Sequence, residues 1–326
     1  MEGRGALAAS ADGAKPARRR LAGLVWAGVA VMIFSGWFVV TRFSVTRELR
    51  IWDITALRFG VGALLLAPMV LRRGSRLPRG AWVEGLLFAL LWGLPFVLLV
   101  ALGLQLTSAA EAASIAPTLM PVFAGLFAWA FLHDPPGRAL RFGYAAIVLG
   151  LAGLVTAGAA AHGAPDPAGL GALVLAAATW ATYTLLFRRS GLSPIQAAAL
   201  ICIWSAALFL PVYLLLGLSR FGLASTGEIA LQAVYQGALM SGVAIVTFNR
   251  AVNLLGPSAA TAIIALLPAI ATVLAVPVLG EMPTPGQGVA IAVIVAGVGL
   301  VARATPPARP RAPRDIVIPP AERTPA

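Results

Sequence analysis

The sequence predicts an all-α integral membrane protein whose ten transmembrane helices form two inverted five-helix repeats. Three observations carry this prediction: the composition, the spacing of the apolar stretches, and a recurrence of landmark residues between the halves. Of the 326 residues, 60% are hydrophobic and only 11% are charged, and the mean hydropathy is +0.90. A soluble domain carries about 25% charged residues. A chain this apolar could not cover its surface with polar groups in water.

Ten stretches are long and apolar enough to cross a bilayer, which requires about 20 residues per helix. Short loops join them, which leaves no room for a soluble domain. In chain order, the predicted spans are residues 21–41, 54–71, 82–102, 107–131, 140–159, 168–187, 194–217, 228–248, 257–279 and 286–302.

The two ends of the chain differ from the spans. Residues 1–20 and 303–326 are expected to be disordered, because the tail is rich in Pro and Arg without a helical period. The basic start followed by apolar residues also resembles a signal peptide. Its apolar run of about 20 residues is longer than the usual 7–15, and no Ala-x-Ala site follows. We therefore interpret residues 21–41 as the first membrane helix.

Basic residues predict the orientation. With the N-terminus in the cytoplasm, 19 of the 24 Lys and Arg residues lie inside and 4 lie outside, at Arg42, Arg47, Arg50 and Arg220. This bias follows the positive-inside rule and favours two cytoplasmic termini. The net charge of +12 is thereby explained by topology, and nucleic-acid binding is not expected.

Landmark residues recur between residues 21–159 and residues 168–302. At an offset of 143, the matching pairs are Trp37 and Trp180, Asp53 and Gln196, and Pro68 and Pro211. At an offset of 147, they are Pro121 and Pro268, Asp134 and Glu281, and Gly150 and Gly297. Because five is odd, the second half must cross the membrane in the opposite sense. Inverted repeats are typical of secondary transporters.

These stretches resemble the drug/metabolite transporter superfamily, specifically EamA-type exporters. The resemblance rests on "FSGWFVVTR", "DITALRFGVGALLLAP", "AATWATYTLLFRR", "SPIQAAALICIWSAALFLPVYL" and "NLLGPSAATAIIALLPAIATVLAVPVLGEM". The first half has "LHD" at Asp134 where the second has "LGE" at Glu281. The resemblance implies ten helices, two cytoplasmic termini, a central cavity lined by the first four helices of each half, and peripheral fifth and tenth helices. The usage of Ala, Arg and Pro indicates a bacterium, whose inner membrane would then hold the protein.

Two charged residues that lie about one turn inside the predicted spans are candidates for the site. Ser108-Ala-Ala-Glu111 matches a capping box, in which Glu111 satisfies the start of a helix. Glu111 is equally a candidate cavity acid that binds a cationic group or carries a coupling proton. Arg58 should lie at a similar depth. It is expected either to pair with Glu111, to share a zwitterionic or anionic substrate with it, or to extend to the headgroups.

Aromatic and amide side chains complete the candidate substrate site. Trp37, Trp180 and Tyr183 lie on the first helix of each half, where they form either a substrate cage or packing aromatics. Gln236 lies four residues after Gln232, with Tyr235 beside it, and a polar stripe in lipid should face the interior.

Interrupted helices in matching positions also indicate the binding region. Prolines interrupt the third, fourth and ninth helices at Pro95, Pro117, Pro121, Pro268 and Pro277. Each proline is also explained as a packing kink. Asp134 and Glu281 are expected to fix short turns rather than to touch substrate.

The predicted function is secondary transport of amino acids or related amphipathic solutes by alternating access, driven either by a proton gradient or by the solute gradient itself. The resemblance implies export. No ATP-binding P-loop is present, and a single cysteine (Cys202) with two histidines (His133 and His162) favours neither a metal site nor a cofactor. No catalytic constellation indicates an enzyme. The alternative is a membrane partner or sensor that transports nothing. The expected partners are a small-molecule substrate and lipid, with a homodimer left open.

Overall fold

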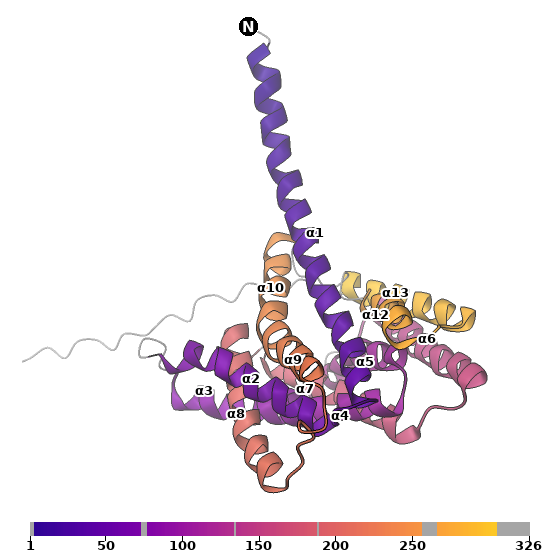
Figure 1. Ribbon diagram of the computed structural model, residues 1–326. Helices are drawn as coiled ribbons and strands as arrows, with labels where there is room; N and C mark the ends of the chain where they lie inside the picture. Colours follow the sequence, from indigo (N-terminus) through magenta and orange to yellow (C-terminus); the bar gives the residue numbers. More distant parts are fainter. Residues whose placement is uncertain (1–2, 73–76, 134, 188, 256–265, 305–326) are drawn as a thin grey trace, which may run out of the picture.

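The computed structural model describes residues 3–72, 77–133, 135–187, 189–255 and 266–304, and these residues form helices joined by short connections (Figure 1). In chain order, the helices of the first half are α1 (Gly3–Val45), α2 (Ile51–Leu71), α3 (Arg79–Phe88), η2 (Ala89–Gly93), α4 (Leu94–Leu106), α5 (Ala109–Leu132) and α6 (Arg138–His162). Those of the second half are α7 (Pro167–Phe187), α8 (Pro194–Leu215), α9 (Thr226–Gln232), η3 (Ala233–Val243), α10 (Ala244–Leu255), α12 (Leu267–Leu279) and α13 (Pro285–Ala304).

The ten-span architecture is confirmed. In the described residues, nine continuous helical segments are long and apolar enough to cross a membrane, and α12 is a shorter apolar helix. The predicted span 257–279 lies partly outside the described residues. Large apolar side chains face outward, with Leu64 78%, Phe131 76% and Leu215 85% exposed. Water would disfavour such a surface, whereas lipid accommodates it.

The N-terminal segment differs from the sequence prediction. Helix α1 begins at Gly3 rather than near residue 21, so helical structure extends through most of the segment expected to be disordered. The membrane-length part begins at Arg18. Six alanines among residues 3–20 favour extension of an existing helix, which needs no costly new nucleus, whereas Pro16 and three glycines oppose it. In Figure 1 the N-terminal part projects away from the other helices.

Equivalent helices of the two halves make equivalent contacts. Helix α1 packs against α10 and α12, and its counterpart α7 packs against α4 and α5. Helices α2 and α8 pack against each other, as do α5 and α12, and α6 and α13. Each half contributes five spans, so equivalent helices cross in opposite senses. The pattern indicates a pseudo-two-fold relation between the repeats.

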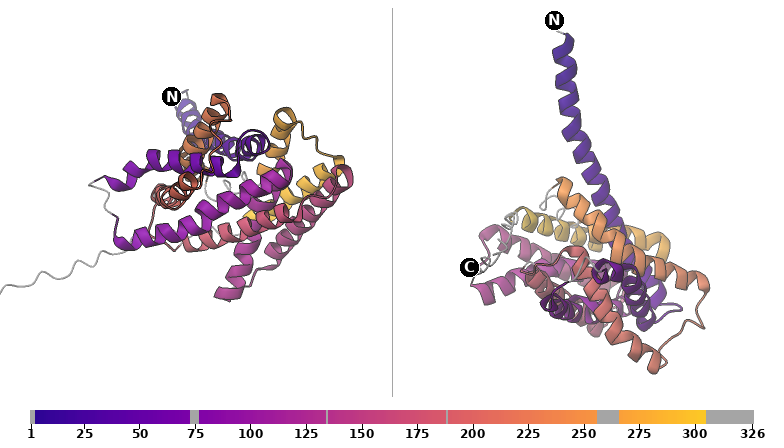
Figure 2. Two further views of the ribbon diagram at one scale, coloured as in Figure 1. Left: turned by 60° about the horizontal axis from the view of Figure 1, so that its bottom comes forward. Right: turned by 90° about the vertical axis from the view of Figure 1, so that its left-hand side faces the viewer.

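Two local features, a π-helical segment and a glycine contact, occur in equivalent spans of both repeats. The third span of each half contains a π-helical segment, and these begin at Ala89 and Ala233, 144 positions apart. The fifth span of each half contacts the other through glycines. A Cβ on Gly150 would come within 2.7 Å of Ile294, and a Cβ on Gly297 within 3.0 Å of the carbonyl oxygen of Gly143. Small residues thus let α6 and α13 approach closely (Figure 2).

Capping boxes define three helix starts. Helices α5, α8 and α13 are each preceded by a capping residue, at Ser108, Ser193 and Thr284, whose hydroxyl group accepts the backbone N–H three residues later. The side chains of Glu111, Gln196 and Gln287 return the bond by accepting the backbone N–H of the capping residue. The structural interpretation of Glu111 is therefore correct.

Candidate functional site

A buried cluster forms where α1, α2 and η3 meet. The guanidinium carbon of Arg58 lies 5.1 Å from the centroid of the Trp37 ring, a cation–π distance. The indole N–H of Trp37 donates to Gln236 Oε1 at 2.7 Å, and Arg58 Nη1 donates to the same oxygen at 3.4 Å. Three residues that the sequence indicated as separate candidates thus lie together, although the sequence predicted Arg58 beside Glu111.

The amide of Gln236 continues a polar chain along α1. Its nitrogen donates to Thr41 Oγ1 at 2.8 Å and to Gln232 Oε1 at 3.1 Å. The nitrogen of Gln232 donates in turn to Ser44 Oγ at 2.8 Å and to the Val40 carbonyl at 2.7 Å. Gln232 and Gln236 are fully buried, and these bonds satisfy their amides. The expectation that this polar stripe faces the interior is confirmed.

Aromatic rings extend the cluster into the second half. Trp37 stacks at 6.5 Å on Phe96, which meets Trp180 edge-on at 5.7 Å. Trp92 stacks on Trp180 at 5.9 Å and on Tyr183 at 4.7 Å. The rings of Trp37 and Trp180, which are repeat equivalents, therefore both contact Phe96. We call these five rings the aromatic wall.

The local sequence explains how α4 contributes to the wall. Pro95 has no N–H to donate to the carbonyl one turn earlier, and η2 directly precedes α4. The π segment therefore contains Trp92 and ends one residue before Leu94, whereas Phe96 lies in the first turn of α4. π segments are frequent at functional sites, and this one supports the inference from interrupted helices at Pro95.

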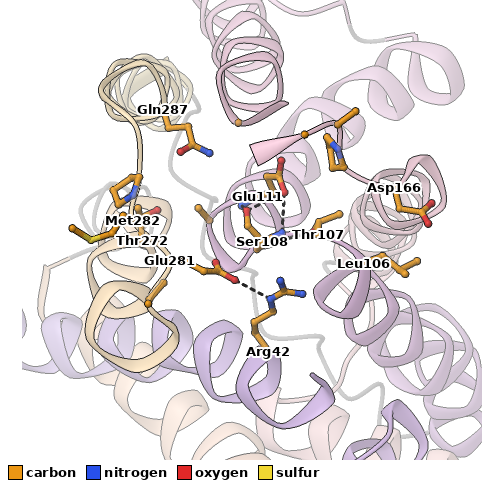
Figure 3. Close-up of a pocket in the computed structure, with 18 residues that line it drawn as sticks. Arg42, Leu106, Thr107, Ser108, Glu111, Asp166, Thr272, Glu281, Met282 and Gln287 are labelled. Carbon is orange, nitrogen blue, oxygen red and sulfur yellow. Dashed lines mark hydrogen bonds and ion pairs between the residues drawn. The ribbon is translucent and has the colours of Figure 1, made fainter. Parts of the chain in front are cut away.

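A second feature is an open cavity of about 510 Å³ at one end of the bundle, which we call the Arg42 end (Figure 3). The ends of α1, α4, α6 and α12 and the starts of α5, α7 and α13 line it. Arg42 Nε donates to Glu281 Oε1 at 2.9 Å, and Glu281 Oε2 accepts the backbone N–H of Ala109 at 2.9 Å. Arg42 Nη1 also donates to the carbonyls of Leu104 and Gln105.

Glu281 thus joins the two halves of the protein. We call the Arg42–Glu281 ion pair with its Ala109 bond the latch. Its two charged side chains are about one-fifth and one-quarter exposed. The sequence predicted that Glu281 fixes a short turn and did not predict this contact between the repeats. Sequence spacing cannot show which distant basic residue pairs with the Glu281 carboxylate. Its repeat counterpart Asp134 lies outside the described residues.

Comparison with known proteins identifies the architecture. Two segments, residues 21–156 and 167–303, match the family described as the EamA-like transporter family. The chain belongs to this family. It is therefore a multi-pass membrane protein of a transporter family, and the family assignment from the sequence is confirmed.

Two individual proteins resemble this EamA-like protein. A curated relative from Streptantibioticus cattleyicolor (strain ATCC 35852), named a probable terminal-alkyne amino-acid exporter, is 33% identical over 202 residues. That match spans 60% of this chain and 65% of the relative, so less than two-thirds of its length. A solved crystal structure covers 86% of this chain and 97% of its own with a TM-score of 0.59. At 24% identity it supports the fold alone.

The two remaining candidates of this EamA-like protein, Glu111 and Tyr235, make their hydrogen bonds outside the buried cluster. Glu111 lines the cavity at the Arg42 end, and its Oε2 accepts both the backbone N–H and the hydroxyl of Ser108. Glu111 makes no ion pair with Arg58, which contacts Trp37 and Gln236 instead. The Tyr235 hydroxyl donates to the Ile33 carbonyl at 3.1 Å over Gly36, so Tyr235 fastens η3 to α1.

Proposed function

We propose that the protein is a secondary transporter of the bacterial inner membrane that exports small amphipathic amino acids by alternating access. The family supports transport, and the named relative supports an amino-acid substrate. The distribution of Lys and Arg supports two cytoplasmic termini. In this orientation the Arg42 end faces outward, because α1 leaves the cytoplasm and ends there.

The observation that carries the proposal is the position of Arg58. A guanidinium group keeps its charge at physiological pH, and an unpaired charge within a membrane span is costly. Among the described residues, Arg58 has a single long bond to Gln236, a ring contact with Trp37 and no carboxylate partner. A substrate carboxylate would supply the missing anion through charge-assisted hydrogen bonds.

The aromatic wall suits the rest of such a substrate. Flat rings from both halves offer apolar contact to an aliphatic or alkyne side chain, and their faces attract an ammonium group. The indole N–H of Trp92 is buried and finds no acceptor among the described residues. Such a donor costs about 1–3 kcal/mol unless an acceptor reaches it. A polar atom of the substrate is therefore an expected partner.

The latch supplies a closed state for alternating access. Because Arg42 belongs to the first repeat and Glu281 to the second, opening the Arg42 end must break their ion pair. The cavity beside the latch is then the outer vestibule through which substrate leaves. Glu111 lies in this vestibule rather than beside Arg58, so we assign it to the release path as well as to the α5 cap.

The test is exchange of radiolabelled leucine, or of a terminal-alkyne amino acid, across vesicles that contain only the purified protein. Removing the charged bonds with Arg58→Met should weaken apparent affinity by about 10- to 150-fold, since such bonds contribute about 1.5–3 kcal/mol. Arg58→Lys should recover part of the loss.

The matched control is Arg72→Met at the exposed end of the same helix, which should behave as the parent protein does. Absence of exchange in the parent protein would instead favour the alternative, a membrane partner or sensor. Equal affinities in Arg58→Met and the parent protein would remove Arg58 from the site.

A further inference from the structure

Glu228 departs from the capping pattern of α5, α8 and α13. Ser225 caps α9, and its hydroxyl accepts the backbone N–H of Glu228 at 3.3 Å. In a complete capping box Glu228 would accept the backbone N–H of Ser225 in return. That N–H instead donates to Glu48 Oε2 at 2.7 Å, from the connection between α1 and α2. The cap is completed by Glu48, and the Glu228 side chain is released from that role.

The carboxyl group of Glu228 is buried, and one of its two oxygen atoms has no hydrogen-bond partner among the described residues. Glu228 is 7% exposed, and its Oε1 atom is enclosed with no hydrogen-bond partner in the described part of the chain. A buried ionised carboxylate needs partners, and a protonated carboxyl needs fewer. This arrangement therefore suits a group that changes protonation rather than one that only stabilises a helix.

Charged neighbours come from the α1–α2 connection and from α2. Glu48 and Arg47 adjoin the carboxyl group of Glu228. The backbone N–H of Ser225 lowers the pKa of Glu48, so Glu48 stays ionised there and a second negative charge beside it is unfavourable. On the start of α2, Arg50 is exposed, while Asp53 is committed to the Tyr213 hydroxyl and the Arg220 backbone.

A directed chain of donors leads from the buried cluster towards Glu228. Trp37 donates to Gln236, Gln236 to Gln232, and Gln232 to the Ser44 hydroxyl. This hydroxyl adjoins Glu228, and its own proton remains available because its oxygen accepts from Gln232. Glu228 and Gln236 lie eight residues apart, roughly 12 Å along the helix.

Every N–H in this chain points from the cluster towards Glu228. Aligned hydrogen bonds polarise one another, so the chain favours an ionised Glu228 most strongly when the positive charge of Arg58 stands at its other end. Arg58 and Trp37 both donate to Gln236 Oε1. A ligand that neutralises the charge of Arg58 therefore weakens the stabilisation of ionised Glu228.

We propose that Glu228 is a proton-binding site, in contact with the outer solution through Glu48, whose ionised form weakens the hold of Arg58 on a substrate carboxylate. The proposal rests on the proposed function and adds the control of that site. When a substrate carboxylate binds Arg58, the negative charge of Glu228 loses the support of the Arg58 charge. Glu228 then takes one proton from the outer solution. Release of the carboxylate returns that proton. Amides do not need to carry a proton along the chain, because the coupling is electrostatic.

The coupling is reciprocal, so protons must also strengthen substrate binding. We expect radiolabelled leucine to bind the purified full-length protein about 5- to 150-fold more tightly at acidic than at alkaline pH, the usual range of such coupling. Leucine should also cause proton uptake, which an indicator dye in weak buffer would detect.

Glu228→Gln keeps the shape of the side chain but cannot ionise. This variant should bind leucine at every pH as tightly as the parent does in acid, and should take up no proton. Because the expected effect is a gain of affinity, loss of folding cannot imitate it. Ser44→Ala breaks the chain beside Glu228 and should flatten the pH dependence. The matched control is Glu84→Gln on the exposed face of α3, which should keep the parental pH profile.

The outcomes separate the two proposals. If the parent protein binds no leucine at any pH, the proposed function fails. If it binds leucine without pH dependence or proton uptake, or if Glu228→Gln retains both, the transport function stands and the assignment of Glu228 is overturned.

Discussion

Adding a methyl group at Gly297 should weaken the contact between the fifth helices of the two repeats. The new Cβ of Gly297→Ala would lie 3.0 Å from the carbonyl oxygen of Gly143 and 3.0 Å from the backbone nitrogen of Ile147. These atoms belong to the backbone of α6 and cannot turn away, so the helices must separate. Overpacking of this kind costs about 1–3 kcal/mol.

Gly299→Ala provides the matched control two residues further along α13, where an added Cβ meets nothing within 4 Å. Both variants gain about 1 kcal/mol of helix propensity, so their difference isolates the clash. At about 2–4 °C per kcal/mol, Gly297→Ala should melt about 2–12 °C below Gly299→Ala. Tryptophan fluorescence during heating in detergent would report both transitions. Equal melting temperatures would refute the close approach of α6 and α13.

Three further predictions concern ionisable and polar groups. Because the pKa of Glu48 is lowered from its ordinary value of 4.5, its stabilising contribution is present above that pH and is lost as the pH falls through the folded value. The melting difference between the parent and Glu48→Gln should therefore be largest near neutrality and vanish in acid. Glu281→Gln should open the latch more often, and a cysteine placed at Ala110 in a Cys202→Ser background should then react faster with a water-soluble maleimide. Unchanged labelling would argue against a latch. Gln236→Glu places a carboxylate beside the buried guanidinium and should weaken leucine binding at least about tenfold with folding preserved; unchanged affinity would contradict the assigned site.

The fold could be predicted from the sequence because lipid imposes simple requirements. Backbone groups in a bilayer must be satisfied within each helix, so apolar length alone locates most spans. The odd number of spans per half then fixes the inversion. Trp37 and Trp180 indicated the internal repeat, and as repeat equivalents they lie close to each other in the structure, where both contact Phe96.

Other parts of the site depend on contacts that no local pattern encodes. Trp92 and Phe96 were missed as wall residues, although Pro95 between them was the available signal. The latch requires Arg42 and Glu281, 239 positions apart, to meet in space. Glu228 looks like another capping acid in the sequence, and only the three-dimensional position of Glu48 reveals that it is not one.

The central claim is that Arg58 and the aromatic wall recognise the carboxylate and the apolar side chain of an amino acid. Competition against radiolabelled leucine exchange by unlabelled leucine and by leucine amide tests this claim most directly, because the two competitors share the side chain and the ammonium group and differ in the carboxylate. Leucine amide should compete at least about tenfold more weakly, the loss expected for a charge-assisted bond. Equal competition by both compounds would contradict the account.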